Sequence, residues 1–287
     1  MGRPTISSLE RPPRRYRPDL HMPRFETVEE AQREDARRAA FVSTNPINDS
    51  RQLQKRKGGL YRALKASASG TPAVTPVSKL FMREFRIRTH GALWQLVDEC
   101  TEPVSTFTII KRSWIRFPDN IDHLDPVALK ADLRTSLNRA GAKHTSGFLY
   151  ASLDGEFMQE REICNPRFNG VRPALYQVHF QGIASGEKIE VIDRLRKQRC
   201  FAPWMGDDKV RGCRTPVQLS REPLTNLPSP LAYTDKGFWK MQRNGKTLRI
   251  PEPHHTQVLL TLNDFRIEDL TLLMNLKVKA GKLLIAH

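Results

Sequence analysis

The chain has 287 residues, of which 39% are hydrophobic, so it can form one large domain or a catalytic domain with extensions. It carries 47 lysines and arginines against 31 aspartates and glutamates, a net charge of +16, which favours nucleic acid as a partner through counterion release and electrostatic steering. A run of about 18 apolar residues, as a membrane span requires, is absent, and the first residues lack the apolar segment of a secretory signal, so we expect a cytoplasmic protein with no membrane partner.

The first 72 residues are predicted to form a basic arm outside the core. Prolines alternate with arginines over 11–18, and proline breaks helices while like charges repel one another. One short polar helix is expected over 26–40, with Thr27 as its N-cap. Nothing here requires burial, so we expect 1–72 to be largely disordered, with either nonspecific phosphate contacts or no specific role.

A core domain is expected over 73–250. Hydrophobic residues at 75–100 fit a helix that packs on the core, and 106–110 has the pattern of an apolar strand. Lys111 and Arg112 follow this strand and would meet phosphates if its end opens on a cleft. Apolar residues at three- and four-residue intervals predict a helix over 125–139.

Polar residues interrupt the next two predicted strands. The strand over 147–153 ends in Asp154-Gly155-Glu156, which is either a carboxylate pair at the end of a strand or an ordinary turn. The strand over 174–185 places His179 and Gln181 on one face, because residues two apart in a strand point the same way. An imidazole and a carboxamide side by side either hold a divalent metal or satisfy each other in the core.

The remainder of the chain adds basic and aromatic residues. A helix over 190–197 turns Arg194 and Lys197 outward, where they could follow a DNA backbone, and 214–219 reads as a short edge strand. A helix from 231 is expected to carry Tyr233 and Lys236 on one face. Residues 238–246, which include Lys240 and Arg243, suit single-stranded DNA or a hairpin packed on the core. A helical extension is expected over 251–287, with helices over 253–262 and 267–276.

The spacing of the four cysteines does not favour a zinc finger or a disulfide framework. They are widely spaced, and no Cys-x-x-Cys occurs. Cys200 and Cys213 could flank a zinc loop, although paired ligand spacing is absent. We expect all four to be reduced thiols.

The order of three short motifs resembles the HUH endonuclease superfamily, specifically the rolling-circle replication initiators known as Rep proteins. The motifs are Thr106 to Ile110, His179-Phe180-Gln181 and Tyr233-Thr-Asp-Lys236, and the resemblance covers about residues 104–245. It implies an α+β fold, with a central antiparallel sheet and flanking helices. The chain departs from the family pattern at Gln181, where the second metal histidine is expected.

The resemblance also implies roles for individual residues. Tyr233 would be the nucleophile and Lys236 an auxiliary cation, while His179, Gln181 and Asp154, with Glu156 as the fallback, would hold Mg²⁺ or Mn²⁺. The expected activity is nicking and rejoining of single-stranded or hairpin DNA through a covalent phosphotyrosine. No Gly-x-x-x-x-Gly-Lys-Ser/Thr motif is present, so a host helicase would be required.

Two other functions remain open from sequence. A catalytically inactive DNA-binding protein on the same fold would explain the basic charge and Gln181 together. An RNA-binding regulator shares the charge and would prefer RNA in competition.

Overall fold

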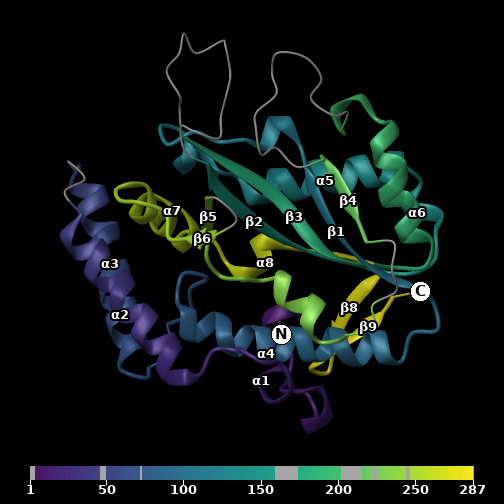
Figure 1. Ribbon diagram of the computed structural model, residues 1–287, viewed down its shortest axis with the longest axis horizontal. Coiled ribbons are helices and arrows are strands. Elements are labelled where there is room, and N and C mark those ends of the chain that lie inside the picture. The colour runs from purple at the N-terminus through teal and green to yellow at the C-terminus, as the bar shows by residue number, and fades with distance from the viewer. Residues whose placement is uncertain are drawn as a thin grey trace.

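The computed structural model describes residues 4–45, 50–71, 73–158, 174–201, 215–220, 224, 226–243 and 246–286, with the backbone alone at 242 and 243 (Figure 1). The helices are α1 (Pro18–His21), α2 (Val28–Thr44), α3 (Arg51–Ala68), α4 (Lys79–Asp98), α5 (Pro126–Arg139), α6 (Glu187–Arg194), α7 (His254–Asn263) and α8 (Ile267–Leu270). The strands are β1 (Val104–Ile110), β2 (Leu149–Met158), β3 (Leu175–Ser185), β4 (Val217–Leu219), β5 (Lys240–Arg243), β6 (Lys246–Leu248), β7 (Thr271–Met274), β8 (Leu276–Lys279) and β9 (Lys282–Ile285). None of the helices described is long and apolar enough to cross a bilayer.

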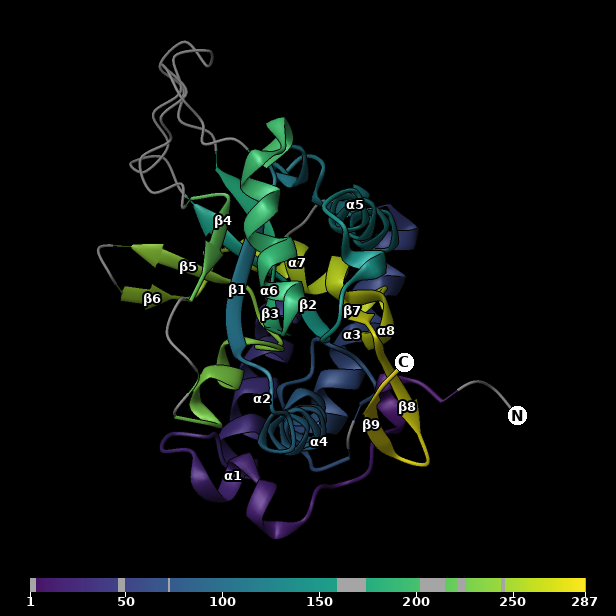
Figure 2. The ribbon, with the colours of Figure 1, turned by 90° about the vertical axis from the view of Figure 1, so that its right-hand side faces the viewer.

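A mixed sheet with flanking helices forms the centre of the molecule. Its strand order is β4-β1-β3-β2-β5-β6, and β7 pairs with β2 as well. β3 is antiparallel to both β1 and β2, as the sequence predicts. The expectation of a wholly antiparallel sheet is wrong at one place, because β5 runs parallel to β2. α4 runs below the sheet in both views (Figures 1 and 2).

The two faces of the sheet differ in chemistry because side chains alternate along each strand. On one face of β3, Tyr176, Val178 and Phe180 are fully buried among aromatic neighbours such as Trp114. The other face carries Gln177, His179 and Gln181, which are also buried. This polar face of β3 continues onto the neighbouring strands and positions the candidate site.

The N-terminal segment is helical, which differs from the prediction of a largely disordered arm. Thr27 caps α2 and forms a reciprocal capping box with Glu30, as expected for the short polar helix. α3 was not predicted, and it buries Leu60 and Leu64. This packing could not be predicted from the sequence, because charged residues such as Arg38 of α2 are buried along with the apolar ones.

The C-terminal extension is only partly helical. α7 forms close to where the sequence predicts a helix, but the expected helix over 267–276 ends at Leu270. Residues Thr271–Met274 instead form β7, which pairs with β2 and buries Leu272. A short apolar run suits a helix and a strand equally well, and here the free edge of β2 decides the outcome.

Candidate functional site

The register of β2 and β3 brings the three expected metal-binding side chains together. Asp154 lies directly opposite His179, and Gln181 is one residue pair further along the same face. The Nε2 amide of Gln181 donates a hydrogen bond to Oδ2 of Asp154 at 2.5 Å, and Nε2 of His179 lies 3.7 Å from the same oxygen. Glu156 points to the same face, opposite Gln177, and is also buried.

The tautomer of His179 is fixed by its own strand. Nδ1 lies 3.0 Å from the carbonyl oxygen of Gln177, so this nitrogen carries the proton and donates to the carbonyl. The Nε2 lone pair then faces Asp154. Burial lowers the pKa of His179, which keeps the ring neutral near pH 7. Such an arrangement suits a metal ligand, whose second nitrogen is usually held by a backbone carbonyl or a carboxylate.

Lys236 lies at the centre of this cluster. Its Nζ is 3.0 Å from Oδ2 of Asp154 and 3.3 Å from Oε1 of Gln181. Burial is the largest single influence and raises the pKa of Asp154, but Lys236, His179 and the Gly155 N–H together outweigh it and the pKa is lowered, so Asp154 is ionised near pH 7. Lys236 therefore occupies the position beside Asp154 and Gln181 where the sequence predicts a metal ion.

Tyr233 comes close to Lys236 without the predicted α-helix. The segment Ser229–Tyr233 is a 3-10 helix that ends at Tyr233 itself. Asp235 then adopts a left-handed conformation with φ of 49°, and this turn brings Nζ of Lys236 to 6.0 Å from the centre of the Tyr233 ring. Tyr233 is 67% exposed, so the residue is accessible to a ligand from solvent.

Tyr233, Lys236 and Gln181 line one cavity of about 570 Å³, which we call the Tyr233 cavity, whereas Asp154 and His179 are not among its described lining residues. Its lining includes both Tyr233 and Gln181, together with Thr106 and Thr108 of the first motif. Gln218 of β4 also contributes, a residue that sequence reasoning did not select. The sequence places Gln218 in the short strand predicted over 214–219, but its position directly opposite Thr108 of β1 follows only from the structure.

A buried polar network holds the loop between Tyr233 and Lys236 in place. Tyr150 donates a hydrogen bond to Oδ2 of Asp235 at 2.6 Å, and Nε2 of His90 lies 3.3 Å from the same atom. Thr234 donates to Asp235 as well and lies 3.1 Å from the His90 ring. Burial keeps Tyr150 protonated by raising its pKa well above the ordinary value. The network ties the loop to β2 and α4.

The structure describes the side chains of five of the six residues expected to contact nucleic acid, and these five do not all line one cavity. Lys240 lines the Tyr233 cavity, but Lys111 is engaged in an ion pair with Asp132, at 2.6 Å from Oδ1. Arg112, Arg194 and Lys197 are exposed, and none of them lines that cavity as far as its lining is described. The side chain of Arg243 lies outside the described residues.

No family model, curated protein or solved structure matches this chain. In the described part of the chain, no three His, Cys, Asp or Glu side chains are grouped to hold a metal. Asp154, His179 and Gln181 nevertheless supply two oxygen donors and one nitrogen donor, which suits Mg²⁺ or Mn²⁺, provided that Lys236 moves away from the oxygens.

Proposed function

We propose that this protein nicks and rejoins single-stranded or hairpin DNA through a covalent phosphotyrosine at Tyr233, as rolling-circle initiators do. The observation that carries the proposal is the exposed Tyr233 phenol in one cavity with Gln181 and Lys236, both of which bond Asp154. The net charge of +16 supports a polyanionic substrate.

The proposed chemistry uses the side chains in named roles. The oxygen of Tyr233 attacks the phosphorus of a phosphodiester, and a new O–P bond forms as the bond to the 3′ oxygen breaks. The phenolic proton is lost, and the departing 3′ oxygen gains one, so the products are a 5′-phosphotyrosine and a free 3′-hydroxyl. Rejoining reverses the step. Lys236 offsets negative charge that builds on the phosphate.

A divalent cation would be held by Asp154, His179 and Gln181. When bound, it would polarise the scissile phosphate. The neutral His179 ring, with Nδ1 fixed on the Gln177 carbonyl, supports this role. Lys236 would have to leave the carboxylate, and it would then be free to contact the phosphate.

A second candidate is a DNA-binding protein without catalysis. The observation in its favour is that Lys236 already bonds both Asp154 and Gln181, so the cluster is satisfied by an ammonium ion. In that case the same cavity would bind a strand without cleaving it.

A labelled-strand assay separates the two candidates. The protein is incubated with Mn²⁺ and a pool of single-stranded and hairpin oligonucleotides labelled at the 3′ end, and then run on a denaturing gel. We expect the label to transfer to the protein with wild type and with Tyr61→Phe, a tyrosine on α3 outside the Tyr233 cavity. Tyr233→Phe should abolish the transfer. Strand binding with no transfer in any variant would reject the enzyme and favour the binding protein.

A further inference from the structure

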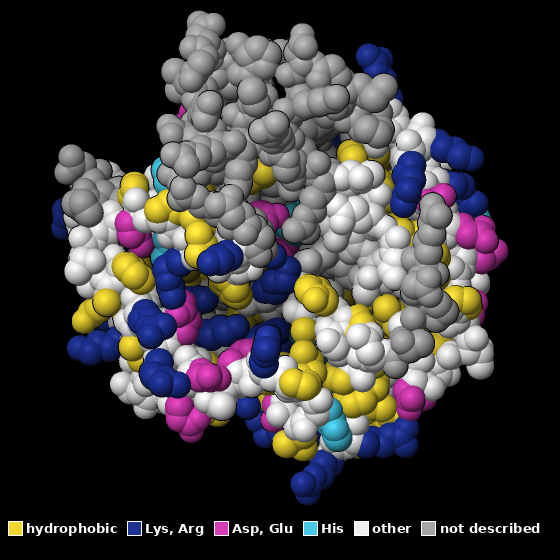
Figure 3. Space-filling view, in the orientation of Figure 1, with side chains coloured by type: hydrophobic (Ala, Val, Ile, Leu, Met, Phe, Trp, Pro, Cys, Tyr) yellow, Lys and Arg dark blue, Asp and Glu magenta, His cyan; other side chains and the backbone are white. Residues whose placement is uncertain are grey.

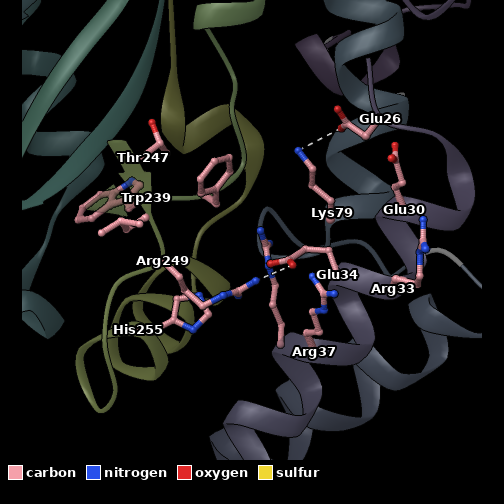
Figure 4. A pocket seen from close by; sticks show the side chains of 13 residues that line it. Glu26, Glu30, Arg33, Glu34, Arg37, Lys79, Trp239, Thr247, Arg249 and His255 are labelled. Atoms are coloured by element: carbon pink, nitrogen blue, oxygen red, sulfur yellow. Dashed lines mark hydrogen bonds and ion pairs between the residues drawn. The ribbon is translucent and has the colours of Figure 1, made fainter. Parts of the chain in front are cut away.

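A second cavity, of about 530 Å³, lies between α2 and the β5–β6 hairpin (Figure 4). We call it the α2–hairpin groove. Its volume falls within the range of roughly 300–1,000 Å³ that is typical of ligand sites. Arg33 and Arg37 come from α2 and Lys79 from α4, while Phe238 and Arg249 lie on the hairpin side.

Two of the carboxylates in the groove are neutralised from within the protein. Oε2 of Glu34 lies 2.6 Å from Arg249, and its Oε1 lies 3.1 Å from Arg38. Burial raises the pKa of Glu34, but the two guanidinium groups outweigh burial and the pKa is lowered. Glu26 pairs with Lys79 at 3.1 Å. These acids therefore do not attract an external cation.

Arg33 and Arg37 have no such partners. They are one helical turn apart and exposed on α2, and neither makes a hydrogen bond or ion pair with the residues that the structure describes. In total, five cationic and three acidic side chains line the described walls of the groove, an excess of two positive charges. Lys and Arg side chains gather on this face of the molecule between α2 and the hairpin (Figure 3). This part of the surface therefore favours an anionic ligand.

The groove adjoins the Tyr233 cavity. Thr247 of β6 lines both of them, and Phe238 of the groove is only two residues from Lys240 of the Tyr233 cavity. The Phe238 ring is partly exposed and lies 5.5 Å from Nζ of Lys79. Cations beside an aromatic ring are the combination that binds a flexible single strand, through its phosphates and one base face.

We propose that the α2–hairpin groove binds the nucleotides that flank the phosphate at Tyr233, with Arg33 and Arg37 on the strand's phosphates and Phe238 against a base. The inference rests on the proposed function, because it takes the strand in the Tyr233 cavity as its starting point. It adds the direction in which that strand leaves the cavity, along α2.

Fluorescence anisotropy with a labelled oligo-dT of roughly 20 nucleotides, longer than a small domain covers, tests the proposal. The variant is Arg33→Gln with Arg37→Gln. The matched control is Arg51→Gln with Lys55→Gln, which removes the same charge at the same spacing from an exposed face of α3 outside the described cavities. We expect the groove variant to bind about 10-fold more weakly and the slope of log K against log salt to fall by about 1.4, for two lost contacts with a single strand.

The possible results distinguish the proposed strand binding in the groove from the proposed nicking activity at Tyr233. Arg33→Lys with Arg37→Lys should restore the salt slope, because the charges return. If the groove variant and the α3 control bind the oligonucleotide with equal affinity and equal salt slope, the proposal that the α2–hairpin groove binds the strand is wrong. The binding and label-transfer measurements are independent of each other. Weaker binding by the groove variant, without label transfer by wild type, would reject the nuclease alone. Label transfer by wild type, with equal binding by the groove variant and the α3 control, would reject the groove alone.

Discussion

Among single residues, Lys236 has the greatest influence on what the site can do. Its ammonium bonds Oδ2 of Asp154 and Oε1 of Gln181, so a divalent cation must compete with it. Breaking a buried pair is costly when one charge is left alone, and the side chain of Asp154 is only 6% exposed. Metal binding and the position of Lys236 are therefore coupled.

Removing the ammonium should make the metal bind more tightly. In Lys236→Met, the oxygens of Asp154 and Gln181 lose their cation, and we expect Mn²⁺ affinity to rise by about 10-fold, or about 1.4 kcal/mol. Isothermal titration calorimetry at pH 7 measures the change. The double variant Lys236→Met with Asp154→Asn is the control and should lose the gain. Equal Mn²⁺ affinity in wild type and Lys236→Met would contradict the coupling.

Between elements, α2 fixes the start of α4 through one buried carboxylate. Asp35 accepts hydrogen bonds from the hydroxyls of Ser67 and Ser78, at 2.6 and 2.9 Å. It also accepts from the backbone N–H groups of Lys79 and Leu80, at 2.6 and 3.1 Å. A carboxylate suits this place because the N-terminus of a helix carries partial positive charge. Through this contact α2 and α4 present Arg33, Arg37 and Lys79 to one groove.

The contact predicts a large loss of stability in Asp35→Ala. Two buried hydroxyls and two N–H groups lose their acceptor, so we expect the free energy of unfolding to fall by about 3 kcal/mol. Asp125→Ala is the matched control, since Asp125 is an exposed N-cap of α5 with one bond to Ala128, worth about 1 kcal/mol. Urea denaturation at pH 7 compares the two. Equal losses would show that Asp35 is no more than an ordinary cap.

Some elements were predictable from sequence and others were not. Alternation along β3 correctly places His179 and Gln181 on one face, and the Asp125 cap marks the start of α5. The Tyr233 turn was not predictable, because it depends on a left-handed Asp235 held by tertiary contacts to Tyr150 and His90. Lys236 was expected near the site, but its bond to Asp154 needs that turn. The packing of α2 and α3 was missed because its buried groups are charged.

For the whole molecule, three buried histidines set the response to acid. Burial is the main cause that lowers the pKa of His90, His179 and His255 below the ordinary 6.5. Below pH 6.5 the unfolded chain takes up protons that the folded chain does not, so the free energy of unfolding falls as the pH falls. We expect a loss of roughly 1 kcal/mol for each histidine over the first pH unit below 6.5.

Urea denaturation at pH 7.5 and 5.5 measures this loss. His123 is 79% exposed, so His123→Gln should leave the difference between the two pH values unchanged. Equal stability of the wild-type protein at both pH values would show that the three rings do not titrate as their burial requires.

The proposed nicking activity places the covalent bond to DNA on one side chain of the whole molecule. Peptide mapping by mass spectrometry, after reaction with single-stranded DNA and Mn²⁺ and digestion of the DNA, tests this most directly. We expect a nucleotide mass on the peptide that contains Tyr233 and on no other tyrosine peptide. An adduct at a different residue, or bound DNA with no adduct, would contradict it.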